Sequence, residues 1–161
     1  MRLNKQLGIS IFSFPMRYAP INMTDRSYVG VHWTVKELRA ISAILKVTKG
    51  VVAAGSDFFY KAFGKSKKEF REILAMPREF IIFRHDFEEL GETARWRDEY
   101  LKLNGWQKKR LLELVSLPVK ELRATECPAE FKSILPFYLM KHKQSKKMQE
   151  DEDQLSIYDE N

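Results

Sequence analysis

Two side chains in this sequence have the spacing of metal ligands. His85 and Glu89 stand four residues apart, which would place them on one face of a helix. A zinc site takes at least three protein ligands, and the sequence offers no third candidate at a matching spacing. We therefore interpret the pair as a surface histidine among acidic neighbours, Asp86 and Glu88, and not as part of a metal centre.

Two basic clusters lie at or near expected helix starts. They consist of Lys65, Lys67, Lys68 and Arg71, and of Lys108, Lys109 and Arg110. Cationic groups with aromatic neighbours can bind phosphate. The aromatic residues here fall at core spacing, however, and charge runs on helices are usually solvated, so a solvent-exposed face is the favoured interpretation. The glycines nearby are explained as helix caps, and no glycine-rich phosphate loop is present.

The other candidate reactive groups also have structural interpretations. Cys127 is the single cysteine and therefore forms no internal disulfide. We expect it to be an inert, partly buried thiol in a reducing compartment. His32, beside Trp33 and just before a helix start, could stack on a ligand or pack beneath its loop, and packing is the favoured alternative. No serine, histidine and acidic residue are spaced like a recognisable nucleophile site.

Length and composition indicate one globular domain with a polar tail. The chain has 161 residues, of which 44% are hydrophobic and 31% are charged. No run of about 18 apolar residues could span a bilayer, and the N-terminal residues do not form a secretory signal. We therefore expect a cytoplasmic protein without a membrane partner.

The charge is distributed unevenly along the chain. The net charge is +6, but the segment from Lys141 onward holds four lysines and six acidic residues, a net charge of −2. The remainder therefore carries +8. Such a surface attracts nucleic acid or an acidic protein face, although it is also ordinary for a helical protein.

The N-terminal region contains one segment with the character of a strand. Residues 7–14 (LGISIFSF) are β-branched, aromatic or small, and Pro15 ends the run. This pattern predicts a short strand buried on both faces, as in a parallel sheet. The sequence offers no convincing second strand, and residues 50–55 are a weak candidate. Because a buried strand must pair its backbone groups, this one needs a sheet from elsewhere.

The rest of the chain predicts helices. Thr34 and Glu37 form a capping box, as do Ser66 and Glu69, and Ser56 is a helix N-cap. The expected helices cover residues 34–50, 56–64, 66–76, 78–90, 93–103 and 106–115, and a last one runs from Pro128 to a kink at Pro136. The predicted fold is mostly α, with one short N-terminal β-strand and a disordered charged tail over residues 141–161.

Several blocks, taken in order, resemble a known family. They cover residues 11–21, 25–33, 38–41, 49–52, 57–59, 62–64, 69–70 and 76–84. The first contains Ser13-Phe14-Pro15-Met16-Arg17, and the last contains Met76-Pro77-Arg78-Glu79-Phe80. Together they resemble the C-terminal part of a group of radical S-adenosylmethionine proteins. The likeness extends over about residues 7–103.

The resemblance implies a fold and a partner. In that family an N-terminal partial α/β barrel carries a CxxxCxxC motif, whose thiolates hold a [4Fe–4S] cluster that cleaves S-adenosylmethionine. With one cysteine, this chain would bind no cofactor alone and would act with a separate cluster-bearing polypeptide, or be an inactive remnant. Residues 1–33 would then be a barrel-strand remnant and ordered loop, and residues 34–140 the helical C-terminal region. The family pattern places Ser13, Phe14, Met16 and Arg17 on the cofactor side.

Two alternatives from other functional classes remain open at this point. The chain could be an independent basic helical module that binds RNA or DNA, with strongly salt-dependent affinity. It could also be a protein-interaction module that adds its strand to the sheet of a partner.

Overall fold

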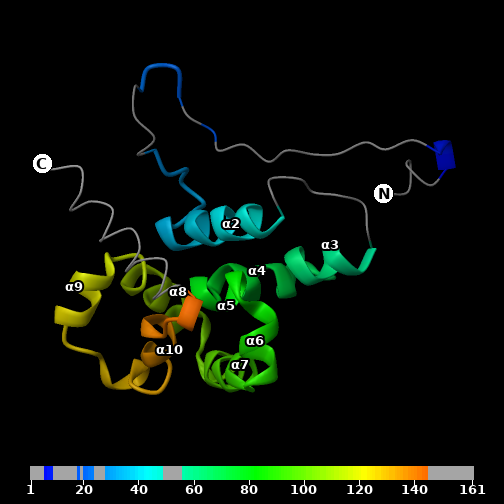
Figure 1. The fold of residues 1–161 in the computed structure, drawn as a ribbon. Coiled ribbons are helices and arrows are strands. Elements are labelled where there is room, and N and C mark those ends of the chain that lie inside the picture. Colours follow the sequence, from blue (N-terminus) through cyan, green and yellow to red (C-terminus); the bar gives the residue numbers. More distant parts are fainter. Residues whose placement is uncertain (1–5, 9–17, 19, 24–27, 49–55, 145–161) are drawn as a thin grey trace, which may run out of the picture.

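A computed structural model describes residues 6–8, 18, 20–23, 28–48 and 56–144, with side chains from residue 59 in the last range (Figure 1). Within these ranges the chain is mostly helical and contains no strand, which confirms the predicted mostly-α fold. The elements are α2 (Val35–Val47), α3 (Ser56–Phe63), α4 (Lys67–Ala75), α5 (Arg78–Ile82), α6 (Arg84–Glu89), α7 (Glu92–Lys102), α8 (Gly105–Leu114), α9 (Val119–Ala124), the 3₁₀ helix η1 (Ala129–Phe131) and α10 (Leu135–Leu139).

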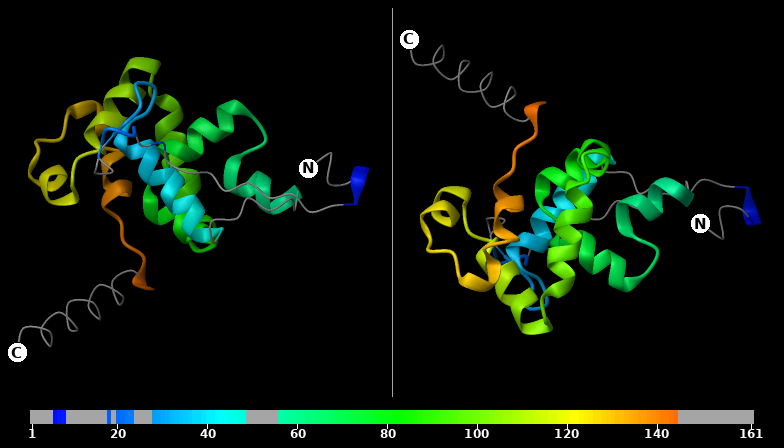
Figure 2. Two further views of the ribbon diagram at one scale, coloured as in Figure 1. Left: turned by 90° about the horizontal axis from the view of Figure 1, so that it is seen from above. Right: turned by 90° about the horizontal axis from the view of Figure 1, so that it is seen from below.

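The helices pack around one core of large apolar side chains. Helix α2 lies across α4 and α5, and α6 packs on α7. Helices α9 and α10 lie at one end of the molecule and α3 lies at the other (Figure 2). The largest fully buried side chains are Trp96, Phe80, Phe131, Leu111 and Ile134. Burial of such side chains is worth about 2 to 3 kcal/mol each, which gives the helical body a core of its own.

Local capping explains where the first helices begin. The predicted capping box of Thr34 and Glu37 is present at α2 in both directions. Helix α4 has Ser66 as its N-cap, and the Glu69 amide donates to the Ser66 hydroxyl oxygen. The Glu69 carboxylate, however, accepts from the Lys65 amide and not from the cap residue itself.

The predicted helix over residues 78–90 is two helices. The break falls at Phe83, which has φ −109° and ψ 46°. The Phe83 ring stacks on His142 with 4.0 Å between ring centroids, so a contact distant in sequence stabilises the break. Phe80 and Phe87 stack at 4.3 Å across it. Leu90, at the end of the predicted helix, is exposed.

The prolines of the C-terminal half begin helical segments. Pro118 is the N-cap of α9, a helix that the sequence pattern did not predict. Pro128 precedes a 3₁₀ turn, and Pro136 lies in the first turn of α10, where its missing N–H is tolerated. The predicted kink at Pro136 is therefore wrong, because the helix starts there.

The predicted strand and tail fall largely outside the described residues. Of residues 7–14, Leu7 is helical and Gly8 is a turn residue with φ +61°, and the others are not described. At the other end, Lys141 and His142 both contact Glu79, so the tail does not begin at residue 141 as predicted. Residues 145–161 lie outside the described ranges.

Candidate functional site

The residues expected on the cofactor side, Ser13, Phe14, Met16 and Arg17, lie outside the described residues. The described residues that follow them expose large apolar side chains. Ile21 is fully exposed, Val31 is 90% exposed and Tyr18 is 70% exposed. We call Tyr18, Ile21, Val31 and Trp33 the N-terminal apolar residues. They precede α2, whereas α2 to α10 enclose a core of their own (Figure 1).

Short-range contacts order the backbone around the N-terminal apolar residues. The Met23 amide donates to the Pro20 carbonyl oxygen at 3.0 Å, and the Trp33 amide donates to the Gly30 carbonyl oxygen at 2.9 Å. The Tyr18 and Tyr28 rings meet edge to face at 5.7 Å. These turns leave the apolar side chains exposed to solvent.

A second feature is a cleft between helices α4, α7 and α8. Its volume is about 480 Å³, and we call it the basic cleft. It is lined by Lys67, Lys68, Arg71, Glu72, Tyr100, Leu101 and Lys108. Members of both basic clusters of the sequence therefore face one cavity, although about forty residues separate them.

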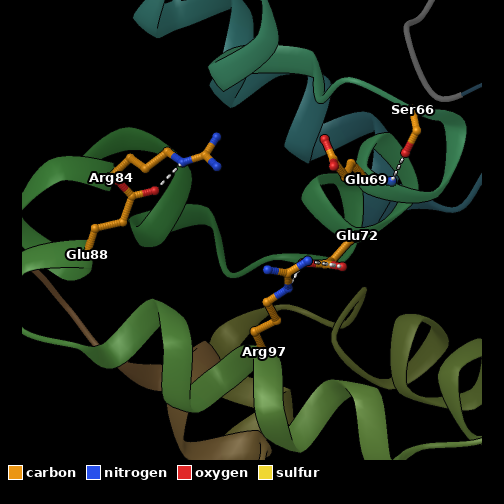
Figure 3. A network of polar contacts seen from close by, with 6 residues as sticks. All are labelled: Ser66, Glu69, Glu72, Arg84, Glu88 and Arg97. Carbon is orange, nitrogen blue, oxygen red and sulfur yellow. Dashed lines mark hydrogen bonds and ion pairs between the residues drawn. The ribbon is translucent and has the colours of Figure 1, made fainter.

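Helix caps position the cations of the basic cleft. Ser66 caps the start of α4 through its contact with Glu69 (Figure 3). Lys67 and Lys68 are the first two residues of that helix. Asn104 and Gln107 form a reciprocal capping box at the start of α8, with 2.9 Å for each hydrogen bond. This box fixes the first turn of α8 beside Lys108.

The aromatic floor of the basic cleft is Tyr100. Its ring stacks on Trp96 at 5.2 Å between centroids, and the Lys108 Nζ atom lies 4.9 Å from the ring centroid. Burial, with a smaller contribution from the Glu72 carboxylate, raises the pKa of the Tyr100 hydroxyl to about 12. The phenol therefore stays neutral at physiological pH and adds no negative charge to the cleft.

The positive charge of the basic cleft is largely uncompensated. Its one acidic lining residue, Glu72, accepts from Arg97 at 2.6 Å (Figure 3). In the described part of the chain, Lys67, Lys68 and Arg71 make no ion pair. Four cations and one carboxylate give the lining a net charge of +3. This arrangement attracts anions.

The remaining candidates stay separate from both features. His85 Nε2 lies 3.4 Å from Glu89 Oε1 on an exposed helix face, and among the described residues no group of three side chains could hold a metal ion. His32 is exposed, so the expected packing beneath its loop is wrong. Cys127 is half-buried, and its thiol lies 3.5 Å from the Pro128 carbonyl oxygen.

The residues of this chain do not fit an iron–sulfur cluster. Three thiolates are needed to hold a [4Fe–4S] cluster of the radical type, and the chain has one cysteine, which contacts backbone. The chain matches no family model, no curated protein and no solved structure. None of the described helices has the length and apolar character needed to cross a membrane.

Sequence reasoning missed two parts of the basic cleft. Tyr100 was not singled out, and the contact of Lys108 with its ring joins α8 to α7 in a way that the sequence does not show. Conversely, Lys109 and Arg110 do not line the cleft. Arg110 forms an ion pair with Glu130 at 3.1 Å and covers the Trp106 ring. A helical wheel of α8 separates Lys108 from Lys109, but cannot show that Lys108 faces α4.

Proposed function

We propose that this chain is the helical C-terminal portion of a split radical S-adenosylmethionine protein, and that it works with a separate polypeptide that carries the iron–sulfur cluster. The support for this proposal is a resemblance: the sequence blocks between residues 11 and 84 resemble segments of this one family and occur in the same order. The single cysteine supports the assignment of the cluster to a second polypeptide, because one thiolate cannot hold a [4Fe–4S] cluster.

The observation that carries the proposal is the contrast between the residues before α2 and the helices that follow them. Helices α2 and α4 to α7 each bury apolar side chains in the core of the chain itself, although Val35, Val47 and Leu101 on these helices are exposed. The N-terminal apolar residues are exposed, and they follow the segment that the family would place in a barrel strand. Under the proposal, the sheet of the partner covers this segment. The same sheet would supply hydrogen-bond partners for the backbone of the predicted strand.

This assignment defines what the chain contributes. It holds neither the cluster nor a complete cofactor site, so alone it is inactive. Its helical body closes one side of the partner's barrel and positions the N-terminal segment there. No catalytic residue is assigned to it.

Co-purification tests the proposal. The partner is sought as the product of a neighbouring reading frame with a CxxxCxxC motif, and we expect it to co-elute with this chain. Replacing two exposed apolar side chains, Ile21→Asp with Val31→Asp, should abolish co-elution, because burying two carboxylates in an apolar interface costs several kcal/mol.

A matched control is Val119→Asp, since Val119 is an exposed valine on α9 and is not one of the N-terminal apolar residues. This variant should co-elute as the unaltered chain does. Loss of co-elution in the Val119→Asp variant alone, or persistence in the double variant, would contradict the assigned surface. Co-elution without cleavage of S-adenosylmethionine would reduce the role to that of an accessory chain.

A further inference from the structure

We propose that the basic cleft binds the phosphate backbone of single-stranded nucleic acid without reading its bases. This binding is independent of the proposed partner, because the cleft lies on α4, α7 and α8 and not on the N-terminal apolar residues. The ligand class follows from the charge, shape and aromatic content of the cleft.

The cations on α4 are arranged to contact neighbouring phosphates. Lys67 and Arg71 are four residues apart, so they lie on one helix face with about 6 Å between their positions. Lys68 is their neighbour along the chain. Because none of the three is held in an ion pair in the described residues, all can turn toward an incoming anion at no cost in broken contacts.

Lys108 faces these cations from the opposite wall. Its Nζ atom lies over the Tyr100 ring, an arrangement that restrains the side chain while the ammonium keeps its charge. Glu72 is the carboxylate that could compete with a phosphate, but Arg97 is bound to it. The cleft therefore presents positive charge from two walls, with no free carboxylate among its lining residues.

The aromatic side chains of this region favour backbone binding over base stacking. Only 8% of Tyr100 is exposed, and its ring already contacts Trp96 and Lys108. Trp106, the exposed aromatic side chain of α8, does not line the cleft, and Arg110 lies over one face of its ring with 5.2 Å from the guanidinium carbon to the ring centroid. Among the residues that line the cleft, no aromatic ring offers an open face on which a base could stack, so binding should depend weakly on sequence.

The shape of the cleft favours a single strand. A cleft of about 480 Å³ has room for a few nucleotides of one backbone, which is the extent of nucleic acid that its four cations can contact. The cations on both walls have long, flexible side chains, which can each contact a different phosphate along one strand. A single compact phosphate group would use only some of them.

Fluorescence anisotropy with labelled oligothymidylate and oligoadenylate of about 12 nucleotides tests the proposal. We expect both to bind with similar affinity. Contact with three or four phosphates predicts that the logarithm of the binding constant falls with the logarithm of salt concentration with a slope of about −2 to −3. A strong preference for one base, or no binding, would overturn the proposal.

Charge reversal locates the site. Lys67→Glu combined with Arg71→Glu should weaken binding about tenfold or more and flatten the salt dependence. The matched control is Lys120→Glu with Lys132→Glu, which removes the same charge from exposed positions outside the cleft. The control should change affinity less than about threefold. Equal losses in both variants would show attraction to net charge alone and would overturn the site.

Competition experiments with two other phosphate ligands test whether the cleft prefers a single strand. Inorganic pyrophosphate should displace the oligonucleotide only at a far higher phosphate concentration, and a duplex of equal length should compete weakly. Equal competition by pyrophosphate would assign the cleft to a compact phosphate ligand, and stronger binding of duplex would exclude the single strand. Thermal unfolding of each variant verifies that it remains folded.

Discussion

The side-chain nitrogen of Lys36 donates a hydrogen bond of 2.7 Å to the carbonyl oxygen of Met76. A second hydrogen bond of 2.9 Å reaches the carbonyl oxygen of Leu74. Lys36 is 5% exposed, so this lysine connects the start of α2 to the end of α4 inside the protein. The contact satisfies two carbonyl groups that the end of α4 would otherwise leave without partners.

The pH dependence of stability should report Lys36. Burial lowers the pKa of its side chain from 10.5 to about 7. Between these values the unfolded chain binds a proton at this position that the folded chain does not bind, so the unfolding free energy should rise with pH, by at most about 1.4 kcal/mol per pH unit. Urea unfolding at several pH values between 7 and 10 measures this.

Replacing the side chain isolates the contribution of Lys36. In Lys36→Met the rise between pH 7 and 10 should shrink, whereas Lys46→Met, at an exposed position of the same helix, should keep it. Parallel pH profiles for the Lys36→Met variant and the unaltered chain would refute the role of this lysine. Above pH 10 the trend should reverse, because burial raises the pKa values of Tyr100 and Tyr138.

The hydroxyl of Tyr138 joins α10 to two other parts of the core. It donates to the Ala75 carbonyl oxygen at 2.8 Å and accepts from the Trp96 indole nitrogen at 3.3 Å. Tyr138→Phe should lower the unfolding free energy by about 1 to 3 kcal/mol, because both partners remain buried without this hydrogen bond. Tyr60→Phe, at an exposed position, should change it by less than about 0.5 kcal/mol. Equal effects in urea unfolding would contradict the interpretation.

The first residues after α10 should contribute to stability. Glu79 is buried, accepts from the His142 amide at 3.0 Å, and lies 3.6 Å from Lys141. A chain that ends after Met140 should lose about 1 to 3 kcal/mol of unfolding free energy relative to one that ends after Gln144, because the first loses the His142 and Lys141 contacts of a buried carboxylate. Thermal unfolding compares the two, and identical midpoints would show that these contacts contribute nothing.

Two glycines with positive φ should respond differently to alanine. Gly64 has φ +78°, and an added Cβ atom would lie 2.7 Å from the Glu69 Cβ and 2.9 Å from the Phe70 nitrogen. Gly91 has φ +73°, but open space surrounds its Cβ position. Gly91→Ala should therefore cost about 1 kcal/mol from the backbone alone, and Gly64→Ala should cost clearly more. The opposite order in urea unfolding would contradict this geometry.

Features set by neighbouring residues could be predicted from the sequence. The cap at Thr34 depends on a residue three positions away, and the start of α2 followed from that pattern. The break at Phe83 could not be predicted, because His142 stabilises it from across the fold. Lys36 gave no signal either, since lysine is almost never fully buried.

The basic cleft was predictable only in parts. The sequence contains both basic clusters, but the positions of α4, α7 and α8 in the fold decide that Lys67 and Lys108 face the same cavity. Arg110 forms its ion pair with Glu130 of η1 instead, a contact that also depends on the fold. At the N-terminus, the expectation of a strand rests on residues 7–14, of which the structure describes only Leu7 and Gly8.

Anaerobic cleavage of S-adenosylmethionine by reconstituted mixtures tests the split-protein proposal most directly. The cluster-bearing partner is assayed alone and with this chain, and this chain is assayed alone. The proposal predicts no cleavage by this chain, and a rate for the mixture well above that of the partner alone. Cleavage by the isolated chain, or an equal rate with and without it, would contradict the proposal.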